Sequence, residues 1–136
     1  MAHRSALVAV STAQLAAGLA GQAVALRRRI PFDTPLMSGR PENVGRDSFL
    51  QGTAFSAPVV MLAAQGWAIV RLFTGPQKGA RQVLHVLGTV MVAGYLLERQ
   101  GRRRLSPGGL DPVETPVVAS GLGLAAAMAL LARGAR

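Results

Sequence analysis

The chain of 136 residues has the length of one domain, a formal net charge of +9 and no cysteine, which excludes disulfide bonds and thiolate metal sites. Its 15 basic residues, 14 of them arginine, are a feature of nucleic-acid-binding proteins, but only six residues are aromatic, so there are few rings on which bases could stack. Because half of the residues are hydrophobic, a basic nucleic-acid-associated protein ranks third among the functions considered below, and we expect no nucleic acid partner.

Four segments contain no Asp, Glu, Lys or Arg: residues 5–26, 48–70, 82–97 and 115–132. A helix rises about 1.5 Å per residue and the hydrocarbon core of a bilayer is about 30 Å thick, so about 20 residues cross it. A water-soluble helical bundle would instead place charges on its outer faces with a 3.6-residue period. The pattern predicts an all-α, polytopic membrane protein with four transmembrane helices, arranged as two helical hairpins in one domain over residues 1–136.

The first predicted transmembrane helix covers residues 5–26 and ends at an arginine triplet, residues 27–29. A secretory signal peptide, cleaved after Ala-Val-Ala at 23–25, is an alternative. Three arginines directly after the cleavage site would oppose export, so we expect the segment to be retained as a helix. A polar loop follows over residues 27–47, in which we expect a short helical turn.

The second predicted helix covers residues 48–72, with Asp47 and Ser48 as candidate N-caps. Pro58 lies in its first half and is expected to bend it, because proline lacks the N–H that the helix needs.

The third predicted helix, residues 81–98, has the shortest uncharged segment and requires Arg81 and Glu98 to extend outward from its two ends. The fourth covers residues 115–132, where Thr115 is the candidate N-cap.

Two arginine triplets, 27–29 and 102–104, follow the first and third predicted helices. Such arginines stay on the cytoplasmic side and contact anionic lipid head groups. The loops 27–47 and 98–114 carry nine basic residues and the other side six, so the positive-inside rule places both loops in the cytoplasm and both termini outside, although all six acidic residues lie in these loops as well. The candidate contacts to a lipid phosphate or to a protein partner are Arg27, Arg28, Arg29, Arg40, Arg46, Arg102, Arg103 and Arg104.

Polar residues inside the predicted helices are the candidates for contacts between helices. An amide in hydrocarbon needs a hydrogen-bonding partner, and each interhelical hydrogen bond contributes about 0.6–2 kcal/mol. We expect these residues to hold the helices together; lining the pathway of a carrier is the alternative. They are Gln14, Gln22, Gln65 and His85.

Small residues at four-residue spacing predict close approach of the first and fourth helices. They are Ala13, Ala17 and Gly21 in the first helix, and Ala119, Gly123 and Ala127, with Gly121, Ala125 and Ala129 beside them, in the fourth.

Motifs for catalysis are missing from the sequence. It contains no spacing typical of a Ser-His-acid triad, no phosphate-binding glycine loop and no metalloprotease motif, and His85 has no second ligand in its segment. We therefore expect no enzyme activity, no metal and no cofactor. The first hypothesis is an accessory or assembly subunit in the cell membrane that contacts anionic lipid and another membrane protein or a second copy of itself. The alternative is a small carrier or lipid-handling protein.

Overall fold

The computed structural model describes residues 2–30, 32–35, 38–48, 52–53 and 55–133. The predicted all-α fold is confirmed over these residues, which form six α-helices and two 3-10 helices. The α-helices are α1 (Ala2–Arg28), α2 (Val44–Asp47), α3 (Val59–Thr74), α4 (Gln77–Leu97), α5 (Arg99–Leu105) and α6 (Glu114–Arg133), and the 3-10 helices are η1 (Pro41–Asn43) and η2 (Pro107–Gly109).

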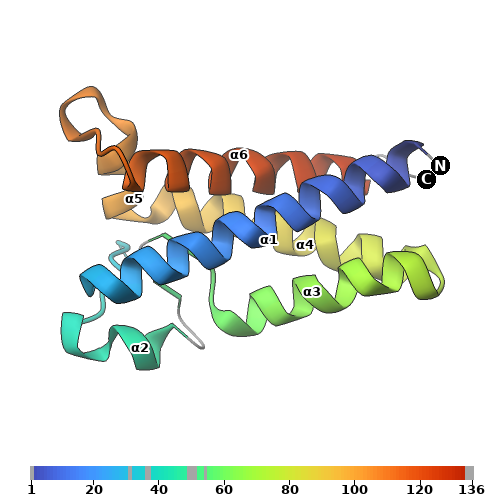
Figure 1. Ribbon diagram of the computed structural model, residues 1–136, viewed down its shortest axis with the longest axis horizontal. Helices are drawn as coiled ribbons and strands as arrows, with labels where there is room; N and C mark the ends of the chain where they lie inside the picture. Colours follow the sequence, from blue (N-terminus) through green and yellow to red (C-terminus); the bar gives the residue numbers. More distant parts are fainter. Residues whose placement is uncertain (1, 31, 36–37, 49–51, 54, 134–136) are drawn as a thin grey trace.

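The four long helices lie side by side along the longest axis of the molecule (Figure 1). They form a ring in which α6 packs against α1 and α4, and α3 packs against α4 and α1. The two ends of the chain and the turn between α3 and α4 lie at one end of the bundle, whereas α2 and α5 lie at the other (Figure 1).

Three of these helices are long and apolar enough to cross a membrane: Arg4–Arg28 within α1, Gln77–Leu97 and Glu114–Arg133. The first, third and fourth predicted segments are thus confirmed as apolar helices of sufficient length. The fourth long helix, α3, is apolar but has only 16 residues, which corresponds to about 24 Å.

The predicted helix over residues 48–72 is wrong at the described residues of its first part, because α3 begins only at Val59; residues 49–51 and 54 lie outside the described residues. Pro58 is the N-cap of α3 and does not bend a longer helix. Before it, Gly52 has a φ of +88°, and Thr53 N–H donates to the Ser56 carbonyl at 3.1 Å, which closes a tight turn. The expected caps are wrong as well, since Asp47 ends the short helix α2 and Ser48 follows it.

The turn that precedes α3 lies inside the bundle. Phe55 is fully buried, and the Tyr95 hydroxyl of α4 donates to its carbonyl oxygen at 3.3 Å. Gly21 of α1 lies so close that an added Cβ would overlap this same carbonyl. Among the described residues of this turn, Thr53, Phe55 and Ser56 are buried.

The small residues of α6 pack on one of the two predicted faces only. Gly121, Ala125 and Ala129 are buried, whereas Ala119 and Gly123 are exposed. In α1, Gly21 is buried but Ala13 is exposed. Helices α1 and α6 do pack against each other, but the exposed Ala13 and Ala119 are not among the small residues buried by this packing.

Helices α4 and α6 approach each other closely at Gly88. A Cβ added there would lie 2.8 Å from the Ala125 carbonyl and 2.9 Å from the Ala129 Cβ. Small side chains on both helices thus allow the two backbones to pack tightly.

Candidate functional site

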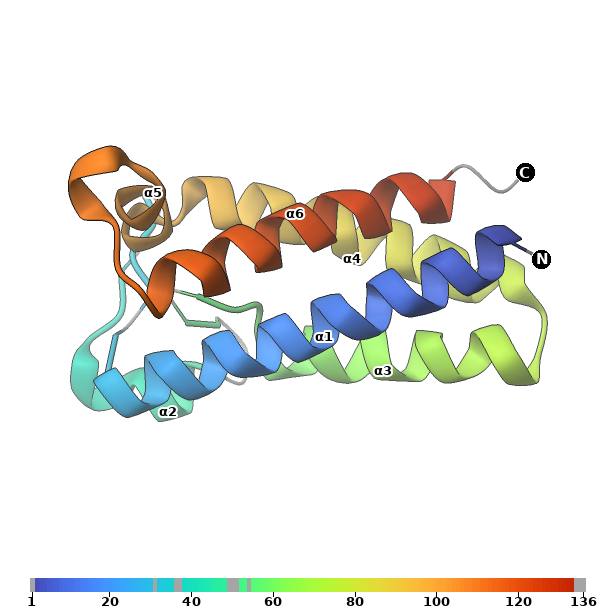
Figure 2. The ribbon, with the colours of Figure 1, turned by 45° about the horizontal axis from the view of Figure 1, so that its top comes forward.

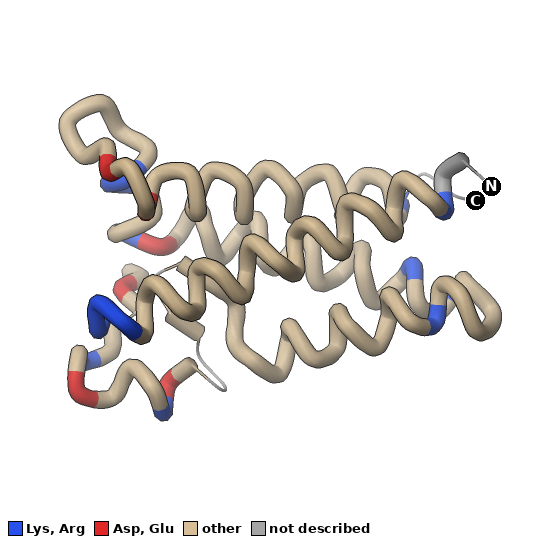
Figure 3. Tube along the Cα trace, in the orientation of Figure 1, with Lys and Arg blue, Asp and Glu red and all other residues tan. Residues whose placement is uncertain are grey.

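Charged residues gather at the two ends of the bundle (Figure 3). We call the end that holds residues 27–48 and 98–114 the charged end, because both arginine triplets and all six acidic residues belong to it. The opposite end has basic residues only, and the described ones are Arg4, Arg71, Lys78, Arg81 and Arg133.

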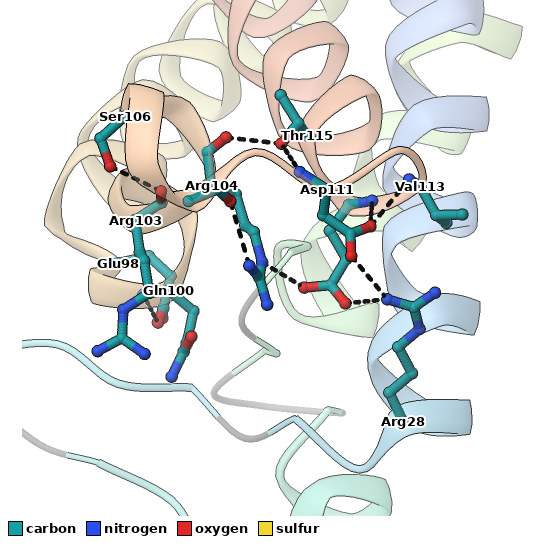
Figure 4. Close-up of polar contacts among 11 residues, drawn as sticks. Arg28, Glu98, Gln100, Arg103, Arg104, Ser106, Asp111, Val113 and Thr115 are labelled. Atoms are coloured by element: carbon teal, nitrogen blue, oxygen red, sulfur yellow. Dashed lines mark hydrogen bonds and ion pairs between the residues drawn. The ribbon is translucent and has the colours of Figure 1, made fainter.

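Glu114, at the start of α6, brings the two arginine triplets together. Its side chain is only 3% exposed. Arg28 of α1 donates from Nη1 to Glu114 Oε2, and Arg104 of α5 donates from Nε to Glu114 Oε1 at 2.9 Å. The Arg28 and Arg104 side chains approach this carboxylate from opposite sides (Figure 4), so three elements far apart in the sequence meet on one buried charge.

Asp111 caps α6, and the expected cap Thr115 does not. Asp111 Oδ1 accepts hydrogen bonds from Val113 N–H and Glu114 N–H, both at 2.8 Å, and these bonds lower the pKa of Asp111 (Figure 4). Thr115 lies within the first turn, where its hydroxyl donates to the Arg104 carbonyl at 2.6 Å and accepts from Asp111 N–H at 2.9 Å. These bonds fix the connection between α5 and α6.

Glu98 joins the loop after α1 to the junction of α4 and α5. Its two carboxylate oxygens accept from Asp33 N–H at 3.0 and 2.9 Å, and Arg99 N–H donates to the Asp33 carbonyl at 2.7 Å. The expectation that Glu98 extends outward is wrong, because it is only 4% exposed. Burial raises the pKa of Glu98 to about 7, although the hydrogen bonds from Asp33 and Gln100 act against this rise.

The other four arginines of the triplets have a different environment. Arg27, Arg29, Arg102 and Arg103 are exposed and form no ion pair with any residue that the structure describes. We call these four residues the outer arginines. Of the two other predicted contacts, Arg40 is exposed, and Arg46 lies 3.5 Å from Asp47 with most of its side chain in solvent.

Arg29 has an unusual backbone conformation. It follows the end of α1 with a φ of +51°, in the left-handed region that favours glycine. The next residue, Ile30, donates its N–H to the Ala25 carbonyl at 2.9 Å, as in a Schellman motif. This motif ends the helix directly after Arg28.

Two of the predicted intramembrane polar residues meet in the bundle interior. Gln65 Nε2 of α3 donates to Gln14 Oε1 at 2.8 Å and to the Ser11 carbonyl at 2.9 Å, both in α1. Gln14 Nε2 lies 3.4 Å from the Gly121 carbonyl of α6. The pair thus links three helices. His85 is not part of this group: its Nδ1 lies 2.9 Å from the Ala129 carbonyl, at the interface of α4 and α6.

Several buried polar atoms have no hydrogen-bonding partner among the residues that the structure describes. Gln22, 7% exposed, has no such partner for either side-chain amide atom. In native proteins most buried polar groups have a partner, so each exception needs an explanation. The other such atoms are Ser11 Oγ, Thr53 Oγ1 and Gln65 Oε1.

The structure thus divides the six arginines of the two triplets into two inner residues, Arg28 and Arg104, and the four outer arginines. The sequence reasoning missed the roles of Glu114, Asp111 and Glu98; the clustering of acids beside the triplets was the available signal. The described part of the chain contains no group of three or more His, Asp or Glu residues placed so that they could hold a metal ion.

Comparison with known proteins adds no identification: no family model matches the chain, and no curated protein or solved structure gives a significant match.

Proposed function

We propose that the chain is a small integral membrane protein without catalytic chemistry of its own, which acts as an accessory or assembly subunit. The observation that carries the proposal is the separation of charge and apolar length: helices long enough to cross a bilayer have their basic and acidic residues at their ends. In this proposal α3 is the fourth transmembrane helix, and α1 with α3 and α4 with α6 form two hairpins. The short length of α3 is accommodated by local thinning of the bilayer.

The charged end faces the cytoplasm in this proposal. Nine of the 15 basic residues belong to it, and the positive-inside rule counts basic residues in short loops without subtracting acidic ones. Two of the six acidic residues at this end, Glu114 and Glu98, are buried and therefore do not add to its exposed negative charge.

In this proposal the surface for a protein partner lies on the outer side of α3. Trp67, Val70 and Phe73 are each more than half exposed. Lipid tails or a second helix would cover these side chains in the membrane.

Membrane extraction followed by purification tests the proposal. We expect the chain to stay in the membrane pellet after sodium carbonate treatment and to co-purify in mild detergent with a stoichiometric partner, identified by mass spectrometry. A Trp67→Ala, Phe73→Ala variant should lose the partner, whereas a Val86→Ala, Val90→Ala variant, altered at exposed positions of α4, should keep it. Release of the chain by carbonate, or purification of a lone chain, would contradict the proposal.

The second candidate function is a small carrier, and the polar atoms without partners in the interior support it. A carrier pathway would admit water to Thr53 and Ser11. Because the chain has no cysteine, single-cysteine variants report on this without background. A carrier predicts that Thr53→Cys and Ser11→Cys react with a small cationic thiosulfonate in membranes while the buried Ala68→Cys does not; equal protection of all three would exclude this function.

A further inference from the structure

Helix α5 runs across the direction of the long helices. Figure 2 shows α5 nearly end-on where α4 and α6 extend across the picture. If the long helices cross the bilayer, α5 lies parallel to its surface, at the level where α4 ends and α6 begins. This is the position of an interfacial helix.

The surface of this segment combines cations with apolar side chains. Arg102 and Arg103 are exposed on α5, and Leu110, 64% exposed, and Val113 follow in the connection to α6. Exposed apolar residues beside arginines suit the boundary between head groups and acyl chains. There the apolar side chains contact the acyl chains and the arginines contact the head groups. A site for a free anion in water has no need of the leucine.

Only the two inner arginines of the triplets form ion pairs with described acidic residues, so the outer arginines are available to bind other groups. Glu114 forms ion pairs with Arg28 and Arg104, and Asp111 lies 3.6 Å from Arg28 as a second acidic partner, so two acids face these two arginines and hold the end of α1 and the end of α5 at the same end of the bundle. The outer arginines then carry four positive charges that form no ion pair with a described acidic residue, although Arg102 is close enough to Glu98 to act on the pKa of its carboxyl. Each of these four guanidinium groups can donate a pair of hydrogen bonds to the phosphate oxygens of a head group.

The left-handed backbone conformation of Arg29 also supports a binding role for its side chain. Glycine would occupy this position without strain, and a charged residue there costs stability. Local strain of this kind is retained where the side chain serves another purpose.

We propose that the outer arginines, Arg27, Arg29, Arg102 and Arg103, together with Leu110, form a membrane-surface site that binds the phosphate groups of anionic phospholipids. The inference rests on the proposed membrane location and names the partner of the charged end. Phosphatidylglycerol, with one net negative charge, is the test lipid and phosphatidylcholine is its zwitterionic counterpart.

Native mass spectrometry of the full chain, released from bilayers of equal phosphatidylglycerol and phosphatidylcholine content, measures the preference. We expect about tenfold enrichment of phosphatidylglycerol on the natural chain. Replacing the outer arginines by glutamine should abolish the enrichment. The matched control removes four charges from the opposite end, at Arg4, Arg71, Lys78 and Arg133, and should retain it.

Equal enrichment in both variants, or none in the natural chain, would overturn the inference. Loss of bound phosphatidylglycerol on addition of millimolar inorganic phosphate would also overturn it, because the site would then be one for the free anion. Carbonate extraction of the same samples separates the two proposals: a chain that stays in the membrane without lipid preference contradicts this inference alone.

A tryptophan at position 110 tests the apolar part of the site. In a Leu110→Trp chain that also carries Trp67→Phe, we expect the emission to shift to the blue on reconstitution and to be quenched by brominated phosphatidylglycerol. Emission that stays at the wavelength of water-exposed tryptophan would exclude membrane contact of this segment.

Discussion

Glu114 is a buried carboxylate whose two arginine partners are themselves partly exposed, Arg28 at 42% and Arg104 at 28%. Removing one partner of a buried ion pair leaves a charge uncompensated, at a cost of about 3–5 kcal/mol when both groups are fully buried. Here solvent reaches the arginines, so the cost is smaller.

We predict that Glu114→Gln lowers the free energy of unfolding in detergent by about 1–3 kcal/mol. Denaturant titration followed by circular dichroism measures it. The control is Glu42→Gln, because Glu42 is exposed and forms no ion pair among the described residues. Equal effects of the two substitutions would show that the contact with the arginines contributes nothing.

A substitution at Arg29 is expected to raise the free energy of unfolding. Its positive φ costs about 1 kcal/mol relative to glycine. We predict that Arg29→Gly raises stability in detergent by about that amount and at the same time reduces the binding of phosphatidylglycerol. Arg27→Gly, in the last helical turn, should lower stability by about 1 kcal/mol, since glycine disfavours a helix. Destabilisation by both changes would contradict the strain argument.

Gly21 allows the turn before α3 to pack against α1. We predict that Gly21→Ala lowers the free energy of unfolding by about 1–3 kcal/mol, because the new methyl group would overlap the Phe55 carbonyl. Gly66→Ala is the matched control, since a Cβ there meets nothing within 4 Å, and it should be neutral or stabilising. Similar thermal unfolding of the two variants would argue against the buried position of Phe55.

At the scale of elements, the contact between Asp33 and Glu98 ties the loop after α1 to the start of α5. The charged groups around Glu98 are Asp33, whose carboxylate lies 3.7 Å from Arg99, and Arg102. Because the pKa of Glu98 rises from 4.5 to about 7 on folding, the folded chain holds this proton at pH values where the unfolded chain has lost it. Glu98 therefore contributes stability below pH 4.5 that is lost as the pH rises to 7.

We predict that the thermal stability of the natural chain falls between pH 4.5 and 7, with a contribution from Glu98 of about 2 kcal/mol. Glu98→Gln removes the titrating group and should remove this part of the fall. Differential scanning calorimetry across the pH range measures both chains. An unchanged slope in the variant would show that Glu98 is ionised throughout.

The length of each apolar segment predicted the helices well where nothing interrupts them, as in α1, α4 and α6. The second segment failed because an uncharged composition does not distinguish a helix from buried irregular backbone. Pro58 and Gly52 were the sequence signals for the later helix start. Proline begins a helix more easily than it continues one, and glycine permits a positive φ. The position of this turn also depends on the contacts of Gly21 and Tyr95 with the Phe55 carbonyl, which no local sequence pattern reveals.

At the scale of the whole molecule, the number of predicted helices was enough to predict that both triplets share one end, because the loops after the first and the third of four spans lie on the same side. The division into inner and outer arginines was not predictable, because Arg28 and Glu114 are 86 residues apart and their contact depends on how α1 and α6 pack. Similarly, Gln14 and Gln65 were recognised as polar residues in apolar helices, but their direct contact follows from the ring order of the bundle.

The ring of four helices predicts which loops share a side of the membrane. In intact cells, we expect an impermeant thiol reagent to label Ser5→Cys and Lys78→Cys from the same side, because both lie at the end opposite the charged end. Gly108→Cys, in the connection between α5 and α6, should be labelled only after permeabilisation. Labelling of Ser5→Cys and Lys78→Cys from different sides would show that α3 does not cross the bilayer.

The pairing of Arg28 with Glu114 has a consequence for biosynthesis. During translation α1 emerges first, and its arginine has no carboxylate partner until the start of α6 has left the ribosome, 86 residues later. In that interval the full charge of the first triplet is available to the insertion machinery, which uses flanking cations to orient a nascent helix. If the chain is inserted as proposed, synthesis of the last helix pairs Arg28 with Asp111 and Glu114 only after the first triplet has been available to orient α1.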